Sequence, residues 1–397
     1  MSNRITNASL DDLVALQTEK IFVNKDPKLP YIGLEHMAQG EPRLLGTANS
    51  SSSISVNAVF KKGDILFGKL RPNLRKSIKA PFDGYCSTDI LVLRSQDGVV
   101  PGFSAHIFQW ERVFSAAVAT AAGTKMPRTS WSDLKRFKVF KPESDQEQTR
   151  IAYILDTVDE AIAQTEAVIA KLKQVRAGML HDLLSYGLDE HGQLRDPATH
   201  PEQFKDSPLG QIPREWDVPK LGDVFSMQAG KFLSSGNITD FGQFPVFGGN
   251  GLRGYTSTYT HEGEYALIGR QGALCGNIMV ASGQFYATEH AVVVTPKEEM
   301  NVGWVASYLT AMNLNRFSES SAQPGLSVHK LSHHRIKLPN FPEQEAIDFQ
   351  IKAIDQQLSS EAAALAKLGS LKSGLQDDLL TGRVRVPETI MEGAENA

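Results

Sequence analysis

A long helix-forming segment occurs twice in this chain, and this repeat constrains the possible folds more than any other feature. Residues 143–186 align without gaps with residues 339–382, at an offset of 196 positions. Asp182-Leu183-Leu184 in the first copy matches Asp378-Leu379-Leu380 in the second. Because self-similarity at a fixed spacing indicates a duplicated structural unit, we expect two copies of one architecture.

Both copies carry apolar residues at the spacing of a coiled-coil seam. The spacing alternates between four and three residues, with one slot skipped in each copy, as at the a and d positions of paired helices. A helix of roughly 40 residues is about 60 Å long and cannot bury an apolar stripe by itself, so we expect the two copies to pair antiparallel. The predicted helix seam consists of Ile151, Leu155, Val158, Ile162, Ile169 and Leu172 in the first copy and Ile347, Ile351, Ile354, Leu358, Leu365 and Leu368 in the second.

Fainter repeats precede the two helices, at an offset of 200 positions. Gly63-Asp64-Ile65-Leu66 matches Gly263-Glu264-Tyr265-Ala266, and Thr88-Asp89 matches Thr288-Glu289. Short apolar runs bounded by Gly and Pro predict strands. Those runs are Asp64–Phe67, Ile90–Leu93, Tyr265–Ile268 and Ala291–Val294. The predicted fold class is α+β, with two globular α/β domains separated by two long helices that pair as an antiparallel coiled coil, in a pseudo-twofold internal repeat.

The domain boundaries follow from these repeats. With 397 residues the chain is too long for one ordinary core, and the stretch between the first helix and the second globular domain is rich in turn formers and charge. The predicted boundaries are 1–142 and 214–338 for the globular domains, 143–186 and 339–382 for the helices, 187–213 for the linker and 383–397 for an acidic tail.

Composition and cysteine usage predict a cytoplasmic protein without a membrane segment. No apolar run approaches the roughly 18 residues that a membrane span needs, and the first residues lack the pattern of a secretory signal. The two cysteines, Cys86 and Cys275, are far apart in sequence, which favours a reducing compartment and argues against a cysteine-based metal site.

Charge is unevenly distributed along the chain. The net charge is −4, which by itself argues mildly against nucleic-acid binding. However, residues 61–80 hold seven basic residues and one acid, and residues 123–141 hold six basic residues and one acid. A local basic face matters more for binding DNA than the total charge does, so these two runs predict DNA contacts.

The sequence lacks the motifs of common enzyme classes, and no catalytic or metal-binding residues are predicted. Gly63 to Lys69 nearly matches a phosphate-binding loop, but Leu70 replaces the hydroxyl residue that would hold magnesium. His329, His333 and His334 cluster without a known metal spacing. The tetrapeptide typical of amino-methyltransferases is absent as well.

Several segments resemble those of a known family, namely the specificity subunits of Type I restriction-modification systems. Their order and the duplication make the resemblance specific, and it covers nearly the whole chain. The segments are Pro30-Tyr31-Ile32-Gly33-Leu34-Glu35-His36, Gly63-Asp64-Ile65-Leu66-Phe67-Gly68-Lys69-Leu70-Arg71-Pro72, Cys86-Ser87-Thr88-Asp89-Ile90-Leu91-Val92-Leu93, Ser207-Pro208-Leu209-Gly210-Gln211-Ile212-Pro213-Arg214-Glu215-Trp216, Phe244-Pro245-Val246-Phe247-Gly248-Gly249-Asn250-Gly251, Pro342-Glu343-Gln344 and Asp378-Leu379-Leu380-Thr381-Gly382.

The resemblance implies a role in choosing DNA sequence rather than in catalysis. Each globular domain would be a target-recognition domain that reads one half of a split double-stranded DNA target, and the helices would set the gap between the halves. Methyltransferase (M) subunits would dock on the chain, bind S-adenosylmethionine and methylate a flipped adenine, and a restriction/motor (R) subunit would join them in phage defence. The chain itself would need no cofactor.

DNA contacts are predicted from the basic runs and from polar residues near glycine-rich turns. Arg and Lys suit guanine edges, and Asn and Gln suit adenine. The candidate DNA-binding residues are Lys69, Arg71, Arg75, Lys76, Lys125 and Arg128 in the first domain and Asn250, Arg253, Arg270, Gln271 and His290 in the second.

Three other functions stay open at this stage. The first is a nucleotide-dependent enzyme that uses the stretch from Gly63 to Lys69. The second is a structural adaptor whose globular ends bind proteins. The third is a specificity-like subunit of another phage-defence system, which would share most of these features. The two basic runs argue against the adaptor.

Overall fold

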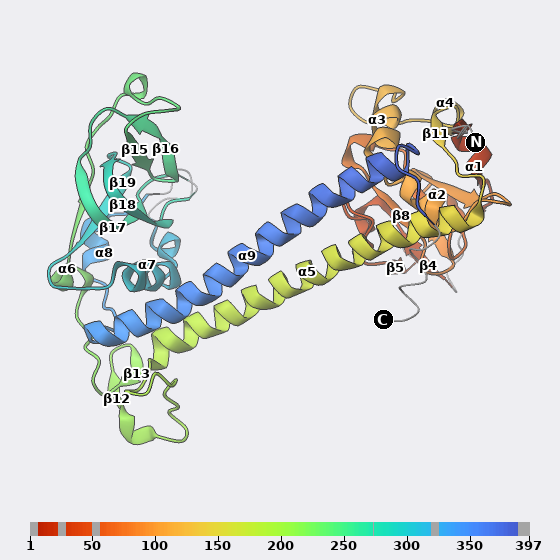
Figure 1. Ribbon diagram of the computed structural model, residues 1–397. Coiled ribbons are helices and arrows are strands. Elements are labelled where there is room, and N and C mark those ends of the chain that lie inside the picture. The colour runs from red at the N-terminus through yellow and green to blue at the C-terminus, as the bar shows by residue number, and fades with distance from the viewer. Residues whose placement is uncertain (1–6, 23–28, 50–55, 273, 319–324, 388–397) are drawn as a thin grey trace. The chain divides into compact units, whose positions relative to one another are not determined.

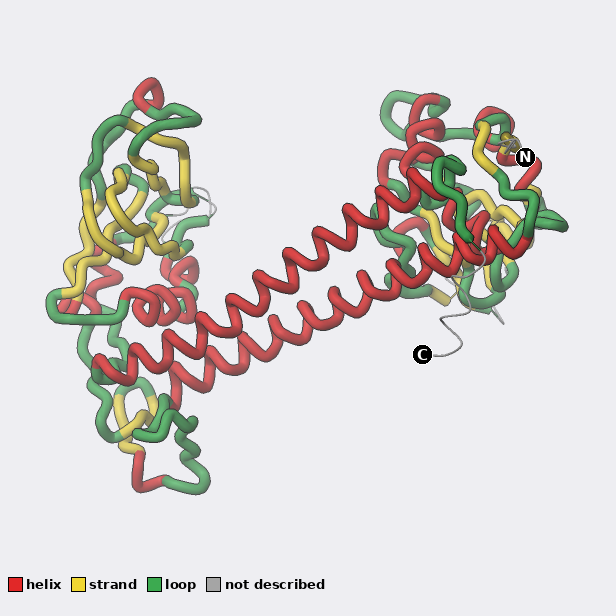
Figure 2. Tube along the Cα trace, in the orientation of Figure 1, coloured by secondary structure: helices red, strands yellow, loops and turns green. Residues whose placement is uncertain are grey.

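The chain forms two compact units, which we describe separately from a computed structural model (Figure 1). The structure describes residues 7–22, 29–49, 56–272, 274–318 and 325–387. Unit 1 comprises Met1–Glu166 and Ala363–Ala397, and unit 2 comprises Ala167–Ala362. Helices and strands occur in both units (Figure 2), so the predicted α+β class is confirmed.

Two long helices pass from one unit to the other. Helix α5 spans Asp145–Tyr186 and helix α9 spans Phe341–Leu379, close to the predicted ranges 143–186 and 339–382. Each helix therefore contributes one part to unit 1 and the rest to unit 2.

Unit 1 is built on two small sheets. Neighbouring strands are antiparallel except β4 and β9, which are parallel. One sheet has the order β2 (Val14–Leu16), β10 (Ile90–Ser95), β7 (Ile65–Gly68), β8 (Ser77–Lys79), and the other has the order β3 (Lys20–Phe22), β6 (Val56–Phe60), β9 (Gly84–Cys86), β4 (Pro30–Ile32), β5 (Ala48–Asn49). Strand β1 (Asn7–Ser9) pairs with β11 (Lys138–Phe140).

Short helices complete unit 1 and cover its core. They are α1 (Leu10–Leu13), α2 (Pro101–Ile107), α3 (Glu111–Ala119) and α4 (Trp131–Leu134), with 3-10 turns η1 (Leu34–His36) and η3 (Pro72–Leu74). In the main core, Phe67 of β7 stacks on Phe114 of α3, with ring centroids 5.1 Å apart. Ile151 and Leu155 of α5 and Leu379 of α9 are buried in the same cluster, so the start of α5 and the end of α9 are anchored in unit 1.

Unit 2 is built on one six-stranded sheet. Its neighbouring strands are antiparallel except β15 and β18, which are parallel. The order is β14 (Phe225–Ala229), β19 (Ala291–Pro296), β17 (His261–Gly269), β18 (Ile278–Ala287), β15 (Phe244–Gly248), β16 (Gly251–Thr256). The helices are α6 (Leu221–Val224), α7 (Val302–Ala311) and α8 (Val328–Ser332), with 3-10 turns η4 (Pro201–Gln203), η5 (Ser235–Asn237) and η6 (Leu314–Phe317).

The stretch predicted as a linker, 187–213, carries structure of its own in unit 2. Strands β12 (Phe204–Ser207) and β13 (Gly210–Pro213) form a two-stranded sheet there. Just beyond it, Trp216 is fully buried in a cluster that contains Ile347 and Ile351 of α9. The start of α9 is therefore anchored in unit 2 as the start of α5 is in unit 1.

The two helix starts are held by equivalent hydrogen bonds. In unit 1, the Gln148 side chain accepts from the Val100 backbone N–H at 2.9 Å and donates to the Pro142 carbonyl at 3.1 Å. In unit 2, Gln344 accepts from the Asn301 N–H at 3.0 Å and donates to the Pro339 carbonyl at 2.9 Å. The repeat in sequence is thus a repeat in structure.

Within each unit the two long helices run antiparallel and share an equivalent ion pair. In unit 1, Lys372 Nζ lies 2.5 Å from Asp159 Oδ1. In unit 2, Arg176 Nη2 donates to Asp355 Oδ2 at 2.9 Å. Asp159 and Asp355 differ by 196 positions, as do Arg176 and Lys372, so the duplication preserves the pairing of the helices.

The predicted seam residues differ in burial along the helices. The first three in each helix are buried and the last three are half-buried. Ile151, Leu155, Ile347 and Ile351 belong to the cores of the globular parts, so these positions also anchor the helices. Of the predicted acidic tail, residues 388–397 lie outside the described residues, and Val386 is buried in unit 1.

Candidate nucleic-acid interface

Six of the eleven candidate residues lie on equivalent loops of the two units, namely Lys69, Arg71, Arg75 and Lys76 in unit 1 and Arg270 and Gln271 in unit 2. One loop follows β7 in unit 1 and the other follows β17 in unit 2. Gly68 at the end of β7 pairs with Ile90, and Gly269 at the end of β17 pairs with Ala291. Gly68 and Gly269 are 201 positions apart in the sequence, and so are their partners Ile90 and Ala291. The loops that begin at Lys69 and at Arg270 therefore correspond.

A second segment joins each of these loops through an isolated bridge. Leu70 bridges to Arg128 in unit 1, and Gln271 bridges to Gly325 in unit 2. The first bridge brings together the two basic runs, 61–80 and 123–141, that the sequence analysis identified separately. The candidates of unit 1 therefore share one region of its surface.

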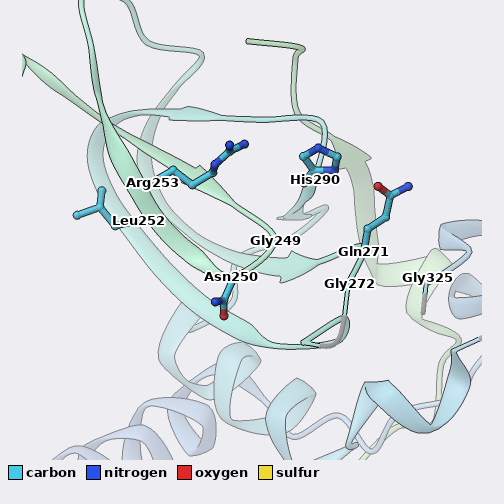
Figure 3. Close-up of a pocket in the computed structure, with 8 residues that line it drawn as sticks. All are labelled: Gly249, Asn250, Leu252, Arg253, Gln271, Gly272, His290 and Gly325. Carbon is cyan, nitrogen blue, oxygen red and sulfur yellow. The ribbon is translucent and has the colours of Figure 1, made fainter. Parts of the chain in front are cut away.

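In unit 2 four of the five candidates line one open pocket (Figure 3). Its volume is about 630 Å³. Figure 3 shows the Arg253 guanidinium extended toward His290, whereas the Asn250 side chain points to another side. Arg270 is not among the lining residues, which are Gly249, Asn250, Leu252, Arg253, Gln271, Gly272, His290 and Gly325.

Glycines let the β15–β16 hairpin approach the rest of the pocket closely. A Cβ atom on Gly249 would lie 3.2 Å from the His290 carbonyl oxygen and 3.3 Å from that of Gln271. Gly251, which starts β16, has φ +103°, a backbone conformation that favours glycine. The hairpin tip is therefore seated directly on the two segments that carry Gln271 and His290.

The polar side chains of this pocket are available to an external partner. Asn250, Arg253 and Gln271 are exposed, and within the described part of the chain their side chains make no hydrogen bond or ion pair. His290 pairs through Nε2 with Glu289 Oε1 at 3.2 Å. None of the eight described lining residues is acidic, which suits an anionic ligand with hydrogen-bonding edges.

The six candidates of unit 1 divide into engaged and free side chains. Arg128 pairs with Asp89 at 2.9 Å, and Arg75 pairs with Glu111 at 2.8 Å. Lys76 donates through Nζ to the Leu34 carbonyl at 2.6 Å, so its ammonium group is committed to the protein.

The remaining three candidates of unit 1 are open to solvent. Lys125 is exposed and Lys69 half-buried, and within the described residues neither side chain has a hydrogen bond or an ion pair. Arg71 is exposed and makes one long contact, from Nη2 to the Lys125 carbonyl oxygen at 3.5 Å. Among the described residues, Arg71 and Lys69 of this loop and Lys125 of the adjoining segment are therefore the candidates of unit 1 whose charged groups form no ion pair.

Some residues of these surfaces escaped the sequence analysis. Leu252 and Gly325 line the pocket of unit 2 but carry no polar group that would mark them. Asp89 and Glu289 hold Arg128 and His290 in place. The repeated Thr-Asp and Thr-Glu pairs at 88–89 and 288–289 do not mark one structural position, because Asp89 is equivalent to His290: the Lys69 N–H donates to the Asp89 carbonyl at 3.0 Å, and the Arg270 N–H donates to the His290 carbonyl at 2.9 Å.

Other kinds of site are not evident in the part of the chain that the structure describes. No group of three or more His, Cys, Asp or Glu residues there could hold a metal ion. No helix among the described residues is both long and apolar enough to cross a membrane.

Comparison with known proteins identifies the family. The profile of the Type I restriction modification DNA specificity domain matches residues 5–174 and 213–369. The chain belongs to this family. The two matched regions correspond to two specificity domains, as the internal repeat predicts, and the resemblance found in the sequence is confirmed.

Specificity subunits of several organisms are similar to the chain. The Escherichia coli Type I restriction enzyme EcoprrI specificity subunit is 43% identical over 157 residues, 38% of each chain. The Methanocaldococcus jannaschii MjaVIII specificity subunit is 23% identical over 295 residues, 66% of each chain. The match thus spans less than two thirds of the length of each of these relatives. The putative MjaX specificity subunit of the same organism is 24% identical over 349 residues, 82% of this chain and 79% of that one.

Solved structures of Type I systems share the fold. A Type I restriction-modification S subunit from M. genitalium has a TM-score of 0.64 at 20% identity and covers 96% of this chain and 97% of its own. A chain from a structural study of complex assembly and conformational transition of the type I R-M system has a TM-score of 0.57 at 18% identity, with 96% and 98% covered.

Proposed function

We propose that this chain is the cytoplasmic DNA-specificity subunit of a Type I restriction-modification complex, and that its two units read the two halves of a split target. The observation that carries the proposal is the pocket of unit 2, which is lined by Asn250, Arg253 and Gln271, three exposed residues whose side chains are unpaired within the described part of the chain. Amide side chains can bind adenine through two hydrogen bonds, and arginine can bind guanine in the same way. The equivalent loop of unit 1 would serve the other half-site.

Catalysis would lie with partner subunits in this proposal. A methyltransferase subunit would bind S-adenosylmethionine and methylate adenine, and a restriction subunit would join the complex. The near match to a phosphate-binding loop gives no support for a nucleotide-dependent enzyme, because Ile65–Gly68 is strand β7 and Pro72–Leu74 is a single 3-10 turn. A phosphate loop would lead into the N-terminus of a helix.

Exposed apolar residues on the long helices support two docking surfaces for methyltransferase subunits. Tyr153 and Leu371 are exposed in unit 1, and Phe349 and Val175 in unit 2. Tyr153 and Phe349 are 196 positions apart, as are Val175 and Leu371. Because the duplication repeats both exposed apolar positions, we assign one methyltransferase subunit to each pair. The long helices would set the gap between half-sites.

The experiment that tests this proposal is a selection from random double-stranded DNA. The chain is co-purified with its methyltransferase subunit, and the DNA retained by the complex is sequenced, with the methyltransferase subunit alone as control. We expect enrichment of a two-part motif with a fixed gap only when the chain is present. Retention of the methyltransferase subunit without any enriched motif would favour the structural adaptor.

A further inference from the structure

The loop after β7 holds two arginines in a backbone conformation that L-residues seldom adopt. Arg71 has φ 51° and Arg75 has φ 53°. Asn313 is the one other non-glycine residue with positive φ in the described part of the chain. In this left-handed region the Cβ atom crowds the backbone, so only glycine adopts it without strain.

The equivalent loop of unit 2 has glycine at both positions of positive φ. Gly272 has φ +91° and Gly276 has φ +87°. They correspond to Arg71 and Arg75 at the offset of 201 positions that relates the paired strands before the loops. The loop shape therefore requires positive φ at both positions, and glycine is compatible with this shape.

Arg75 has a structural partner that offsets its strain. Its guanidinium pairs with Glu111 of α3 at 2.8 Å, and its backbone N–H donates to the Pro72 carbonyl at 2.9 Å. The pair ties the loop to the helix that covers it. The ion pair with Glu111 therefore explains the arginine side chain at position 75.

Arg71 lacks such a partner within the described residues. Its side chain is exposed, and its only hydrogen bond is the 3.5 Å contact with the Lys125 carbonyl oxygen. An ion pair would require a carboxylate oxygen within 4 Å, and none of the described carboxylates meets that distance. Its backbone conformation is held by two hydrogen bonds, since the Arg71 N–H donates to the Pro127 carbonyl at 2.7 Å and the Arg71 carbonyl accepts from the Leu74 N–H at 2.9 Å. A glycine would make the same two bonds, so nothing within the described fold explains the arginine side chain, and this points to a function of the side chain outside the fold.

We propose that Arg71 reads a guanine in the half-site bound by unit 1, an inference that rests on the proposed function. Its guanidinium can donate two parallel hydrogen bonds to guanine O6 and N7 in the major groove. Lys69 of this loop and Lys125 of the adjoining segment would contact phosphates beside it. Arg75, held by Glu111, shapes the loop and reads no base.

The test compares Arg71→Gly, Arg71→Lys and the matched control Arg75→Gly, each in the full chain co-expressed with its methyltransferase subunit. For Arg71→Gly we expect a Tm that is unchanged or up to about 3 °C higher, because strain is relieved. We also expect a roughly 10- to 100-fold slower methylation of the wild-type motif. Mapping of the methylated sites would show relaxed choice at one guanine of one half-site.

The other two variants separate base reading from charge and from folding. Arg71→Lys keeps the charge but loses the planar fork, so it should relax the same guanine. Arg75→Gly should leave the motif unchanged. If the wild type methylates a motif and Arg71→Gly methylates the same motif, the inference about Arg71 is overturned and the proposed function stands. If the wild type methylates no motif, the proposed function itself is overturned.

Two further results would also overturn the assignment of Arg71. Uniform weakening without a relaxed base would make Arg71 a phosphate contact. A fall in Tm of more than about 5 °C in both Arg71→Gly and Arg71→Lys would give Arg71 a structural role.

Discussion

Two glutamates at equivalent positions tie each helix start to the segment that follows the other helix. In unit 2, Glu343 accepts hydrogen bonds from the Leu188 N–H at 2.8 Å and from Trp216 Nε1 at 2.9 Å. It also pairs with Arg195, whose side chain is 9% exposed. In unit 1, Glu147 pairs with Arg385 at 2.5 Å. One buried carboxylate in each unit therefore holds a helix start against the segment that follows the other helix.

Replacing one of these carboxylates should destabilise its unit. Glu343→Gln keeps the shape but leaves the buried Arg195 with only the 3.9 Å pair to the exposed Glu215, so we expect a loss of about 3 kcal/mol in the free energy of unfolding. Urea denaturation followed by tryptophan fluorescence measures it, and Glu345→Gln, at an exposed position of α9, is the control. Equal stability of the two variants would contradict this role of Glu343.

The Glu147–Arg385 pair predicts a pH dependence of stability. The hydrogen bond from Arg385 lowers the pKa of Glu147 below the ordinary value of 4.5. Because the pKa of Glu147 is lower in the folded state than in the unfolded state, the pair stabilises the folded protein at pH values above the unfolded pKa. This stabilisation is lost as the pH falls from about 4.5 through the folded pKa. The Tm difference between the wild type and Glu147→Gln should therefore be large at pH 7 and shrink below pH 4.5. A difference that is constant with pH would argue against the pair.

The pocket of unit 2 makes its own prediction at the residue scale. Asn250→Ala and Gln271→Ala each remove an unpaired amide, so each should relax base choice in the half-site not affected by Arg71 and slow its methylation roughly 10- to 100-fold. The controls are Asn237→Ala and Gln243→Ala, which remove exposed amides outside the pocket. Methylation mapping compares the four variants, and identical motifs in all of them would refute the assignment of this pocket.

At the scale of elements, the long helices were the most predictable part of the chain. Their apolar period and length gave α5 and α9 to within two or three residues at each end. Strands β7, β10, β17 and β19 each overlap a predicted apolar run, and β17 begins four residues before its run. Strands β12 and β13 were missed, because Asp, Ser, Gly and Pro dominate that stretch and such residues indicate turns.

The assembly of the site could be predicted only in part. The residue types were sufficient to nominate Asn250, Arg253, Gln271 and His290, which the fold brings to one pocket. Sequence did not show that Lys76 turns inward to the Leu34 carbonyl, or that Leu70 bridges to Arg128. Both contacts join segments far apart in the chain, and such pairings depend on the packed sheet rather than on local pattern.

Disrupting the helix pair tests the element that links the units. Leu172 of α5 is half-buried and lies one turn before Arg176, which pairs with α9. Leu172→Asp would place a charge against the partner helix, and we expect a Tm several degrees lower and loss of methylation at the split target. Lys171→Asp, at an exposed neighbouring position, should change neither by a comparable amount.

At the scale of the whole molecule, the duplication has kept the helices and diversified the loops that carry the candidate residues. The ion pairs Asp159–Lys372 and Asp355–Arg176 are equivalent, whereas the loops after β7 and β17 differ in charge and chemistry. This is expected if both copies share one structural task but read different bases. The net charge of −4 is compatible with DNA binding in a complex whose other subunits also contact phosphates.

The most direct test of the central claim is a map of adenine methylation in a host that lacks other methylation. The chain is expressed with its methyltransferase subunit, and that subunit is also expressed alone. We predict a split motif with a fixed gap that appears only when the chain is present. A motif that appears without the chain, or no motif in its presence, would contradict the claim that this chain chooses the DNA sequence.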